Sequence, residues 1–243
     1  MDEVKQRVQR YWTARAHDFA TVRKNELKGS ISERWLNEFG KFFSNDKQLD
    51  ILDVGTGSGY FSILLSKAGH KLTGIDITEN MLLEAETTAA DCGAEARFIK
   101  MDAQELSFED NSFDVVVTRN LTWTLPEPQK AYAEWYRVLR PGGILLNFDA
   151  DYAENVRNNN QKLSYINPSD VYGHIGVTKA LEKENAELTL MMPAGINVRP
   201  AWDMELMRQC GFSDISCDTA AGQRILCEHD LPDAPMFRLF GKK

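Results

Sequence analysis

The sequence predicts an α/β fold built on a doubly wound, mostly parallel sheet. Between residues 48 and 150, short apolar strands alternate with amphipathic helices, which is typical of parallel strands joined by right-handed helical crossovers. The stretch 112–120 has a continuous apolar centre, as strands do when both faces of a sheet are covered. A turn with glycine at every second position follows the first strand. The 243 residues fit one large domain of this kind.

The elements can be placed in order along the chain. Apolar residues at helical spacing predict one helix over roughly the first 16 residues and a second from Ile31 to Phe43. Further helices are expected at 60–69, 79–93 (with Thr78 as N-cap), 128–140, 177–187 and 201–212. Strands are expected at 48–55, 71–78, 95–103, 112–120, 144–150, 213–219 and 236–243.

Charge and composition narrow the class of protein. The formal net charge of −8 disfavours binding to nucleic acid, which requires clustered Lys and Arg. No apolar run approaches the ~20 residues of a membrane helix, and residues 1–12 lack the apolar core of a signal peptide, so a cytoplasmic protein is expected. Cys92, Cys210, Cys217 and Cys227 form no CxxC pair, so no metal site is predicted.

The glycine-rich turn at 55–59 does not have the spacing of the common phosphate-binding loops. No Lys-Ser or Lys-Thr follows the glycines, which excludes the Walker loop. The dinucleotide fingerprint GxGxxG places its third glycine where this chain has Tyr60. Asp53, two residues before the turn, repels a pyrophosphate and attracts a cation or an amino group.

Three acids stand at the ends of three successive strands. Asp76 follows Gly55 by 21 residues, where its carboxylate can accept hydrogen bonds from both hydroxyls of a ribose. Asp102 ends the third strand, where an acid and a neighbouring backbone amide can hold the edge of an adenine. Together with Asp53 they predict a nucleoside site at the carboxyl edge of the sheet.

Four stretches resemble the successive motifs of class I S-adenosylmethionine-dependent methyltransferases. They are LDVGTGSGYFS, GIDIT, MDAQELSFEDNSFDVVVTRN and YRVLRPGGILLNFD. Within that class they are most similar to the small-molecule group that includes ubiquinone and menaquinone biosynthesis methyltransferases. The resemblance is close over residues 49–150, in order and spacing as well as in motif. It implies a Rossmann-like methyltransferase fold with a seven-stranded sheet whose last strand is antiparallel.

The resemblance also implies a single domain, 1–243, in four parts. Residues 1–45 form a helical cap, 46–150 the cofactor-binding core, 151–200 a cap insertion on the substrate side, and 201–243 the final helix and strands. The sequence itself supports the insertion, because the regular alternation stops at Asp151. Open α/β sheets bind ligands at their carboxyl edge, which an insertion at this point would cover.

The resemblance implies S-adenosylmethionine as cofactor and S-adenosylhomocysteine as product. Asp53 and the glycine loop would hold the methionine part, Asp76 the ribose and Asp102 the adenine. The positions that match cofactor-binding motifs are Asp53, Gly55, Thr56, Gly57, Gly59, Asp76, Ile77, Met81, Asp102, Ala103, Arg119 and Asn120.

The acceptor implied is a small molecule, methylated by in-line displacement. Positioning and exclusion of water can supply much of the rate, and a base is needed only if the acceptor arrives protonated. The candidate acceptor-side residues are Tyr11, His17, Trp123, Tyr152, Tyr172 and His174. Among them His174, His17 and Tyr152 are the candidate catalytic residues, and the sequence does not choose between them.

Two alternatives remain open at this point. A nicotinamide-dependent (NAD) oxidoreductase shares the β-α-β unit and the ribose-binding acid, although Tyr60 and Asp53 disfavour it. A non-catalytic scaffold that binds S-adenosylmethionine without turnover is compatible with every motif. The identity of the acceptor and the oligomeric state do not follow from the sequence.

Overall fold

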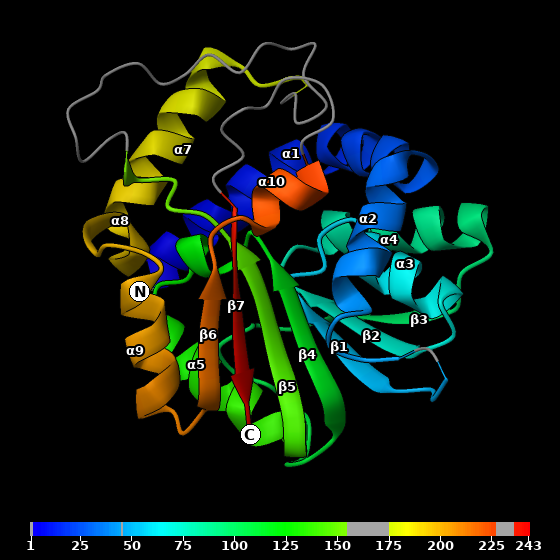
Figure 1. Cartoon of the computed structure of the whole chain (residues 1–243). Coiled ribbons are helices and arrows are strands. Elements are labelled where there is room, and N and C mark those ends of the chain that lie inside the picture. The colour runs from blue at the N-terminus through cyan, green and yellow to red at the C-terminus, as the bar shows by residue number, and fades with distance from the viewer. Residues whose placement is uncertain (1, 45, 155–174, 227–235) are drawn as a thin grey trace.

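The computed structural model describes residues 2–44, 46–154, 175–226 and 236–243. Within them one sheet of seven strands has the order β3-β2-β1-β4-β5-β7-β6 (Figure 1). Strands β1 to β5 pair in parallel, and β7 is antiparallel to both β5 and β6. The strands are β1 (Asp50–Val54), β2 (Lys71–Asp76), β3 (Ala96–Lys100), β4 (Phe113–Arg119), β5 (Leu139–Asp149), β6 (Ser213–Asp218) and β7 (Phe237–Lys242). The doubly wound sheet and its antiparallel last strand are therefore confirmed.

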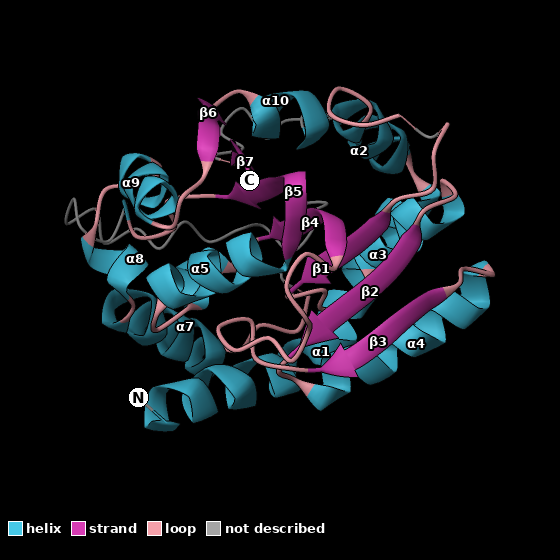
Figure 2. Ribbon diagram, turned by 90° about the horizontal axis from the view of Figure 1, so that it is seen from below, coloured by secondary structure: helices cyan, strands magenta, loops and turns pink. Residues whose placement is uncertain are grey.

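Helices cover both faces of this sheet (Figure 2). One core packs α5 and α9 against the sheet around Trp135, and the other packs α2, α3 and α10 around Trp35. The helices described are α1 (Asp2–Lys28), α2 (Ser30–Phe39), α3 (Tyr60–Lys67), α4 (Glu79–Cys92), α5 (Pro128–Val138), α7 (Lys179–Met191), α8 (Pro193–Ile196), α9 (Ala201–Gln209), α10 (Ala221–Leu226) and the 3-10 turn η1 (Thr122–Thr124).

Several boundaries differ from those expected. Helix α1 continues to Lys28, because its later residues pack against the core: Val22 is 7% exposed and the side chain of Glu26 is fully buried. Helix α2 ends at Phe39, and α10 had no sequence signal. Thr78 stands at the N-cap of α4 but makes no side-chain cap hydrogen bond. The segment 141–143 lies inside β5, where the register against β4 shifts.

Helix α1 is the element that closes the carboxyl edge of the sheet (Figure 1). It spans this edge from Lys5, which pairs with Asp102 after β3, to Glu26, which pairs with Arg119 at the end of β4. Helix α7 packs against it, since Arg7 donates hydrogen bonds to Glu184 at 2.8 and 2.9 Å. None of the described helices is long and apolar enough to cross a membrane.

Candidate functional site

A cavity of about 800 Å³ lies between helix α1 and the carboxyl ends of the parallel strands. Residues from β1, the glycine loop, β2, β4, η1 and the segment after β5 line it, together with residues of α1 and Asn185 of α7. The predicted cofactor residues on its surface are Asp53, Gly55, Thr56, Gly57, Asp76, Ile77, Met81, Asp102, Ala103, Arg119 and Asn120. The structure thus brings together residues that are up to 67 positions apart in the sequence, from Asp53 to Asn120.

The glycine loop makes a close approach that a side chain would block. Gly55 has φ +67°, and a Cβ built there would lie 2.7 Å from a Leu121 methyl carbon. Gly57 has φ +54° and turns its N–H to the Asp76 carboxylate at 3.0 Å. Gly59 is not among the residues that line the cavity: it is the N-cap of α3, and a Cβ there would meet the Ala85 Cβ at 3.0 Å. Its glycine is explained by helix packing.

Asp53 anchors this loop from below. Its Oδ2 accepts hydrogen bonds from the Thr56 hydroxyl at 2.6 Å, the Ser62 hydroxyl at 2.8 Å and the Ser62 N–H at 3.0 Å. Burial raises the pKa of Asp53 to about 6, although these hydrogen bonds act in the opposite direction. The carboxyl group therefore titrates close to neutral pH. Ser62 was not predicted, and its spacing of nine residues from Asp53 gave no signal.

Asp76 and Asp102 lie at the next two strand ends, as expected. Asp76 Oδ1 accepts from the Thr78 N–H at 2.8 Å, and burial raises the pKa of this carboxyl group despite that bond. Burial would also raise the pKa of Asp102, but its contacts with Lys5 and Gln104 outweigh burial and lower it. Lys5 Nζ lies 2.7 Å from Asp102 Oδ2. Asp102 is thus ionised and already paired with the cap helix.

Arg119, the last residue of β4, pairs with helix α1. Its Nη1 donates to the buried Glu26 carboxylate at 3.0 Å, and Arg23 of α1 donates to the same group. Burial would raise the pKa of Glu26, but these two guanidinium groups outweigh burial and lower it. The Arg119 Cζ also lies 4.9 Å from the Trp35 ring centroid and 5.1 Å from that of Tyr60. The side chain therefore ties α1 to the floor of the cavity.

Aromatic rings form the opposite wall of the cavity. The Trp123 ring centroid lies 5.2 Å from that of Tyr152 and 6.5 Å from that of Trp12. Trp12 in turn contacts Tyr11 and Phe19 at 5.2 and 5.5 Å. All five residues line the cavity. Trp12 and Phe19 were expected to lie on a packed helix face but were not selected as site residues, although their spacing from Tyr11 and Arg15 could have indicated it.

Three candidate acceptor residues remain. His17 is outside the cavity: its side chain is 85% exposed, with Nδ1 3.0 Å from Glu84 Oε1. Residues two apart point to nearly opposite sides of a helix, so His17 cannot share a face with Arg15 and Phe19. Tyr172 and His174 lie outside the described residues. No group of three or more His, Cys, Asp or Glu within the described ranges is placed to hold a metal ion.

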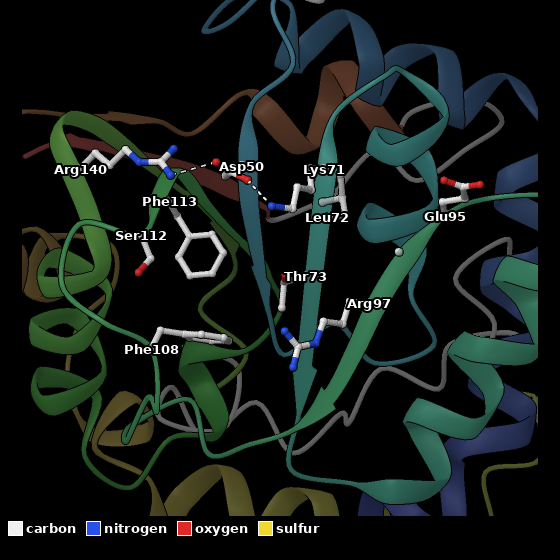
Figure 3. Close-up of a pocket in the computed structure, with 11 residues that line it drawn as sticks. Asp50, Lys71, Leu72, Thr73, Glu95, Arg97, Phe108, Ser112, Phe113 and Arg140 are labelled. Atoms are coloured by element: carbon white, nitrogen blue, oxygen red, sulfur yellow. Dashed lines mark hydrogen bonds and ion pairs between the residues drawn. The ribbon is translucent and has the colours of Figure 1, made fainter.

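A second hollow, of about 530 Å³, lies at the amino ends of the strands (Figure 3). Asp50 at its edge is held by Arg140 at 2.9 Å and Lys71 at 3.2 Å, as the dashed lines show. Arg97 points into this groove from β3, opposite Phe108 and Phe113. None of the described residues predicted for cofactor or acceptor lines it. The amino-end groove is therefore separate from the cavity under α1.

The fold and the cavity are those of an α/β protein with a ligand-sized site at the carboxyl edge of its sheet, and comparison with known proteins identifies its family. Residues 52–147 match a family model described as a methyltransferase domain. An uncharacterised protein of Haemophilus influenzae is 30% identical over 74% of this chain and 78% of its own length. A demethylmenaquinone methyltransferase of Staphylococcus aureus is 37% identical over 46% of this chain and 47% of its own length, so this chain matches about half of that relative.

A solved structure shows the same fold. It is a SAM dependent methyltransferase from Aquifex aeolicus, with a TM-score of 0.56 and 19% identity over 87% of this chain and 88% of that one. The chain belongs to the class I S-adenosylmethionine-dependent methyltransferases, and S-adenosylmethionine is its cofactor.

The residues present fit this cofactor. Gly55 and Gly57 line the cavity, and their positive φ angles shape the turn that brings the backbone to its surface. Asp76 is only partly covered and lies beside Gly57, where its carboxylate can receive ribose hydroxyls. Asp53 contributes a carboxyl group, and Trp12, Trp123 and Tyr152 contribute aromatic rings, to the surface of the same cavity, and such groups suit a cationic ligand. Nothing in this set of side chains conflicts with a bound nucleoside.

Proposed function

We propose that this chain transfers the methyl group of S-adenosylmethionine to a small-molecule acceptor by in-line displacement. One observation carries the proposal: the glycine-loop cradle and the aromatic wall share a single cavity of about 800 Å³. Ligand sites of small-molecule enzymes typically measure about 300–1,000 Å³. The cofactor supplies a methyl group on a positively charged sulfur, which is a good leaving group. The chain's own residues then have to hold both reactants and exclude water.

The assignment of roles within this cavity is part of the same proposal. Asp53 and the glycine loop orient the methionine part, Asp76 receives the ribose, and Asp102 with the Ala103 backbone addresses the adenine. Asp102 must share its carboxylate with Lys5, which holds one of its oxygens. We also propose that residues 1–243 form one domain, with 1–45 and 151–200 as its caps. A cytoplasmic location remains a sequence-based prediction.

For the acceptor we propose a flat, aromatic or amphipathic small molecule. Trp12, Trp123 and Tyr152 all line the cavity, and clustered aromatic rings favour stacking with a planar ligand. The relative from Staphylococcus aureus is named a demethylmenaquinone methyltransferase, and demethylmenaquinone is an acceptor of this kind. Among the described candidate catalytic residues, Tyr152 is the one that lines the cavity. If the acceptor needs to lose a proton, Tyr152 is the first residue to test.

The experiment has a binding part and a turnover part. Isothermal titration with S-adenosylhomocysteine, S-adenosylmethionine and NAD is made on the wild type, on Asp76→Ala and on Asp91→Ala. Asp91 is a matched control, since its side chain is 68% exposed on α4 and outside the cavity. We expect both adenosyl compounds to bind, and Asp76→Ala to weaken them by about tenfold or more, because it removes charge-assisted hydrogen bonds.

Turnover is then measured as transfer of radiolabel from S-adenosylmethionine to a panel of acceptors that begins with reduced naphthoquinones. Binding of NAD alone would contradict the proposal and favour an oxidoreductase. Binding of the adenosyl compounds with no transfer to any class of acceptor would favour the scaffold alternative. Transfer that Asp76→Ala abolishes and Asp91→Ala retains would support methyl transfer at this cavity.

A further inference from the structure

A buried ionic cluster lies directly behind the aromatic wall. It consists of Arg199, at the start of the turn into α9, Asp203 within α9, and Asp149 at the end of β5. Arg199 is 5% exposed and both acids are fully buried. None of the three is among the residues that line the cavity. They cannot touch a ligand there and can act on it only through other residues.

Arg199 is held firmly on one side by Asp203. Its Nε donates to Asp203 Oδ2 at 2.8 Å and its Nη2 to Asp203 Oδ1 at 2.9 Å, which is a two-point contact between planar groups. Asp203 Oδ1 also accepts from the Tyr132 hydroxyl at 3.0 Å. The Arg199 Cζ lies 5.2 Å from the Phe237 ring centroid. Helices α5 and α9 and strand β7 therefore fix the direction of the guanidinium group.

On its other side the same guanidinium holds the two segments that carry the aromatic wall. Nη1 donates to the Ala150 carbonyl at 3.0 Å, and Nη2 donates to the Thr122 hydroxyl at 2.5 Å. Nη2 also donates to Asp149 Oδ2 at 3.2 Å. Thr122 immediately precedes Trp123 in η1, and Ala150 is two residues before Tyr152.

Asp149 completes the connection to the backbone of the wall. Its Oδ2 accepts from the Trp123 N–H at 3.2 Å, and its Oδ1 accepts from the Ala150 N–H at 2.8 Å. The two segments thus share one buried ion pair behind them, while Trp123 and Tyr152 touch in front, with centroids 5.2 Å apart. A shift of Arg199 would change both segments together.

We propose that Arg199 is a positioning residue for the methyl acceptor: it sets the distance and tilt between Trp123 and Tyr152 through Thr122, Ala150 and Asp149. This inference rests on the proposed methyl transfer to an acceptor at the aromatic wall. Lysine in place of Arg199 keeps the charge but cannot bridge Asp203, Thr122 and the Ala150 carbonyl at once, because it lacks the planar fork. The wall would then lose its fixed geometry while the cofactor cradle keeps its own.

The test is Arg199→Lys, with Arg137→Lys as a matched control. Arg137 also joins a carboxylate, Glu134, to two backbone carbonyls, but it lies at the far end of α5. Both proteins carry 5-fluorotryptophan, and ¹⁹F NMR reads the Trp123 signal, which is assigned with Trp123→Phe. We expect the Trp123 signal to shift or broaden in Arg199→Lys only, while those of the buried Trp35 and Trp135 stay in place.

Titration with S-adenosylhomocysteine is expected to give a Kd within about twofold of wild type for both variants, since neither arginine lines the cavity. With an acceptor that the wild type methylates, Arg199→Lys should raise the KM of the acceptor and lower kcat/KM by roughly tenfold to a hundredfold, with the KM of S-adenosylmethionine unchanged. If Arg199→Lys does not fold, Asp203→Asn is measured in the same way.

An unchanged Trp123 signal, together with kcat/KM within about twofold of wild type in a folded variant, would overturn the inference. A general loss of stability that also moves the Trp35 and Trp135 signals would overturn it as well, because the role would then be structural. If the wild type transfers no methyl group, the proposed function fails on its own. The NMR comparison still reports in that case whether Arg199 holds Trp123.

Discussion

The two halves of the cavity are built in different ways. The cofactor half consists of strand ends and the turns that follow them, so Asp53, Asp76 and Asp102 take their places from the sheet itself. The acceptor half combines α1, η1 and the segment after β5, and Trp12 of α1 lies 111 residues before its partner Trp123 of η1. The cofactor half therefore follows from the sheet, while the acceptor wall depends on contacts that only the complete fold creates.

The largest effect should come from adding a single methyl group to the glycine loop at Gly55. Gly55→Ala places a Cβ 2.7 Å from Leu121 in a backbone region with φ +67°. Strain and overpacking together should cost about 2–3 kcal/mol of unfolding free energy. The affinity for S-adenosylhomocysteine should fall roughly a hundredfold, because the loop must move. Urea unfolding and isothermal titration measure the two effects.

Gly69→Ala is the control for that substitution. Gly69 has φ +98°, but a Cβ there meets nothing within 4 Å. It should cost only the backbone strain, about 1–2 kcal/mol, and leave the affinity for the cofactor unchanged. If Gly55→Ala and Gly69→Ala lost equal affinity for S-adenosylhomocysteine, the close approach of Gly55 to Leu121 would not be needed for cofactor binding.

The second largest effect is a loss of acceptor turnover with no loss of cofactor binding, which distinguishes the two halves of the cavity. Trp123→Ala removes the ring that contacts both Trp12 and Tyr152. We expect kcat/KM for the acceptor to fall about thirtyfold, since truncated aromatic anchors commonly cost about 2 kcal/mol or more. The Kd of S-adenosylhomocysteine should stay within about twofold. Steady-state kinetics and titration on the same preparation give both values.

His17→Ala provides the contrast on the acceptor side. His17 was an equal candidate in the sequence, but it points to solvent next to Glu84. Its removal should change neither the kinetics nor the binding of the cofactor. A loss of activity in His17→Ala would place the acceptor outside the aromatic wall and would break the division proposed for the cavity.

The same division explains what could be predicted from the sequence. Residues 49–150 were readable because each strand carries its own local signals: apolar runs, an acid at the end, and a glycine where the backbone turns. The register of the sheet then brings Asp53, Asp76 and Asp102 to one edge without further information. Gly59 was identified as a cofactor residue from its motif, yet it packs against Ala85 and α4.

The acceptor half could not be predicted in the same way. Arg199 lies in a short connection with no periodic pattern, and its partners Thr122, Asp149 and Asp203 come from three other elements. Trp12 was read only as part of an amphipathic helix, since its partner Trp123 is 111 residues away. Helix periodicity reports that a face is covered but not which segment covers it.

The third effect is a pH dependence confined to the cofactor half. Because burial raises the pKa of Asp53 to about 6, its carboxyl group becomes protonated as the pH falls from 7 to 5. A neutral carboxyl group no longer attracts the ammonium of the cofactor, so affinity should fall about tenfold over this range. Titrations with S-adenosylhomocysteine at several pH values measure this, and Asp53→Asn should flatten the profile.

The sign for stability is opposite to the sign for binding. A carboxyl group whose pKa is higher in the folded protein than in the unfolded chain favours folding most below its unfolded value, near 4. That contribution is lost as the pH rises through about 6. The change in unfolding free energy caused by Asp53→Asn should therefore be more favourable at pH 7 than at pH 4.

A profile of cofactor affinity that stays level between pH 7 and 5 in the wild type would exclude Asp53 as the group that senses the ammonium.

The smallest effect concerns Lys5, where a residue of the acceptor-side helix α1 reaches into the cofactor half. The ion pair with Asp102 is 2.7 Å long and about a quarter exposed on each side. Pairs of this exposure contribute about 0.5 kcal/mol, and salt weakens them. Lys5→Met should therefore lower the unfolding free energy by about that amount at low salt, and by less in 0.5 M NaCl.

The pH dependence of the Lys5→Met variant identifies the partner. Burial tends to raise the pKa of Asp102, but the contacts with Lys5 and Gln104 outweigh burial and hold this pKa below its usual value. The ion pair therefore stabilises the folded protein at pH values above the pKa of Asp102 in the unfolded chain. It is lost as the pH falls through the folded pKa, and the difference between wild type and Lys5→Met should vanish in acid. Urea unfolding at pH 7 and pH 3 tests this. A difference that persists at pH 3 would show that Lys5 acts through its aliphatic stem, and that α1 is joined to the cofactor half by packing instead of by charge.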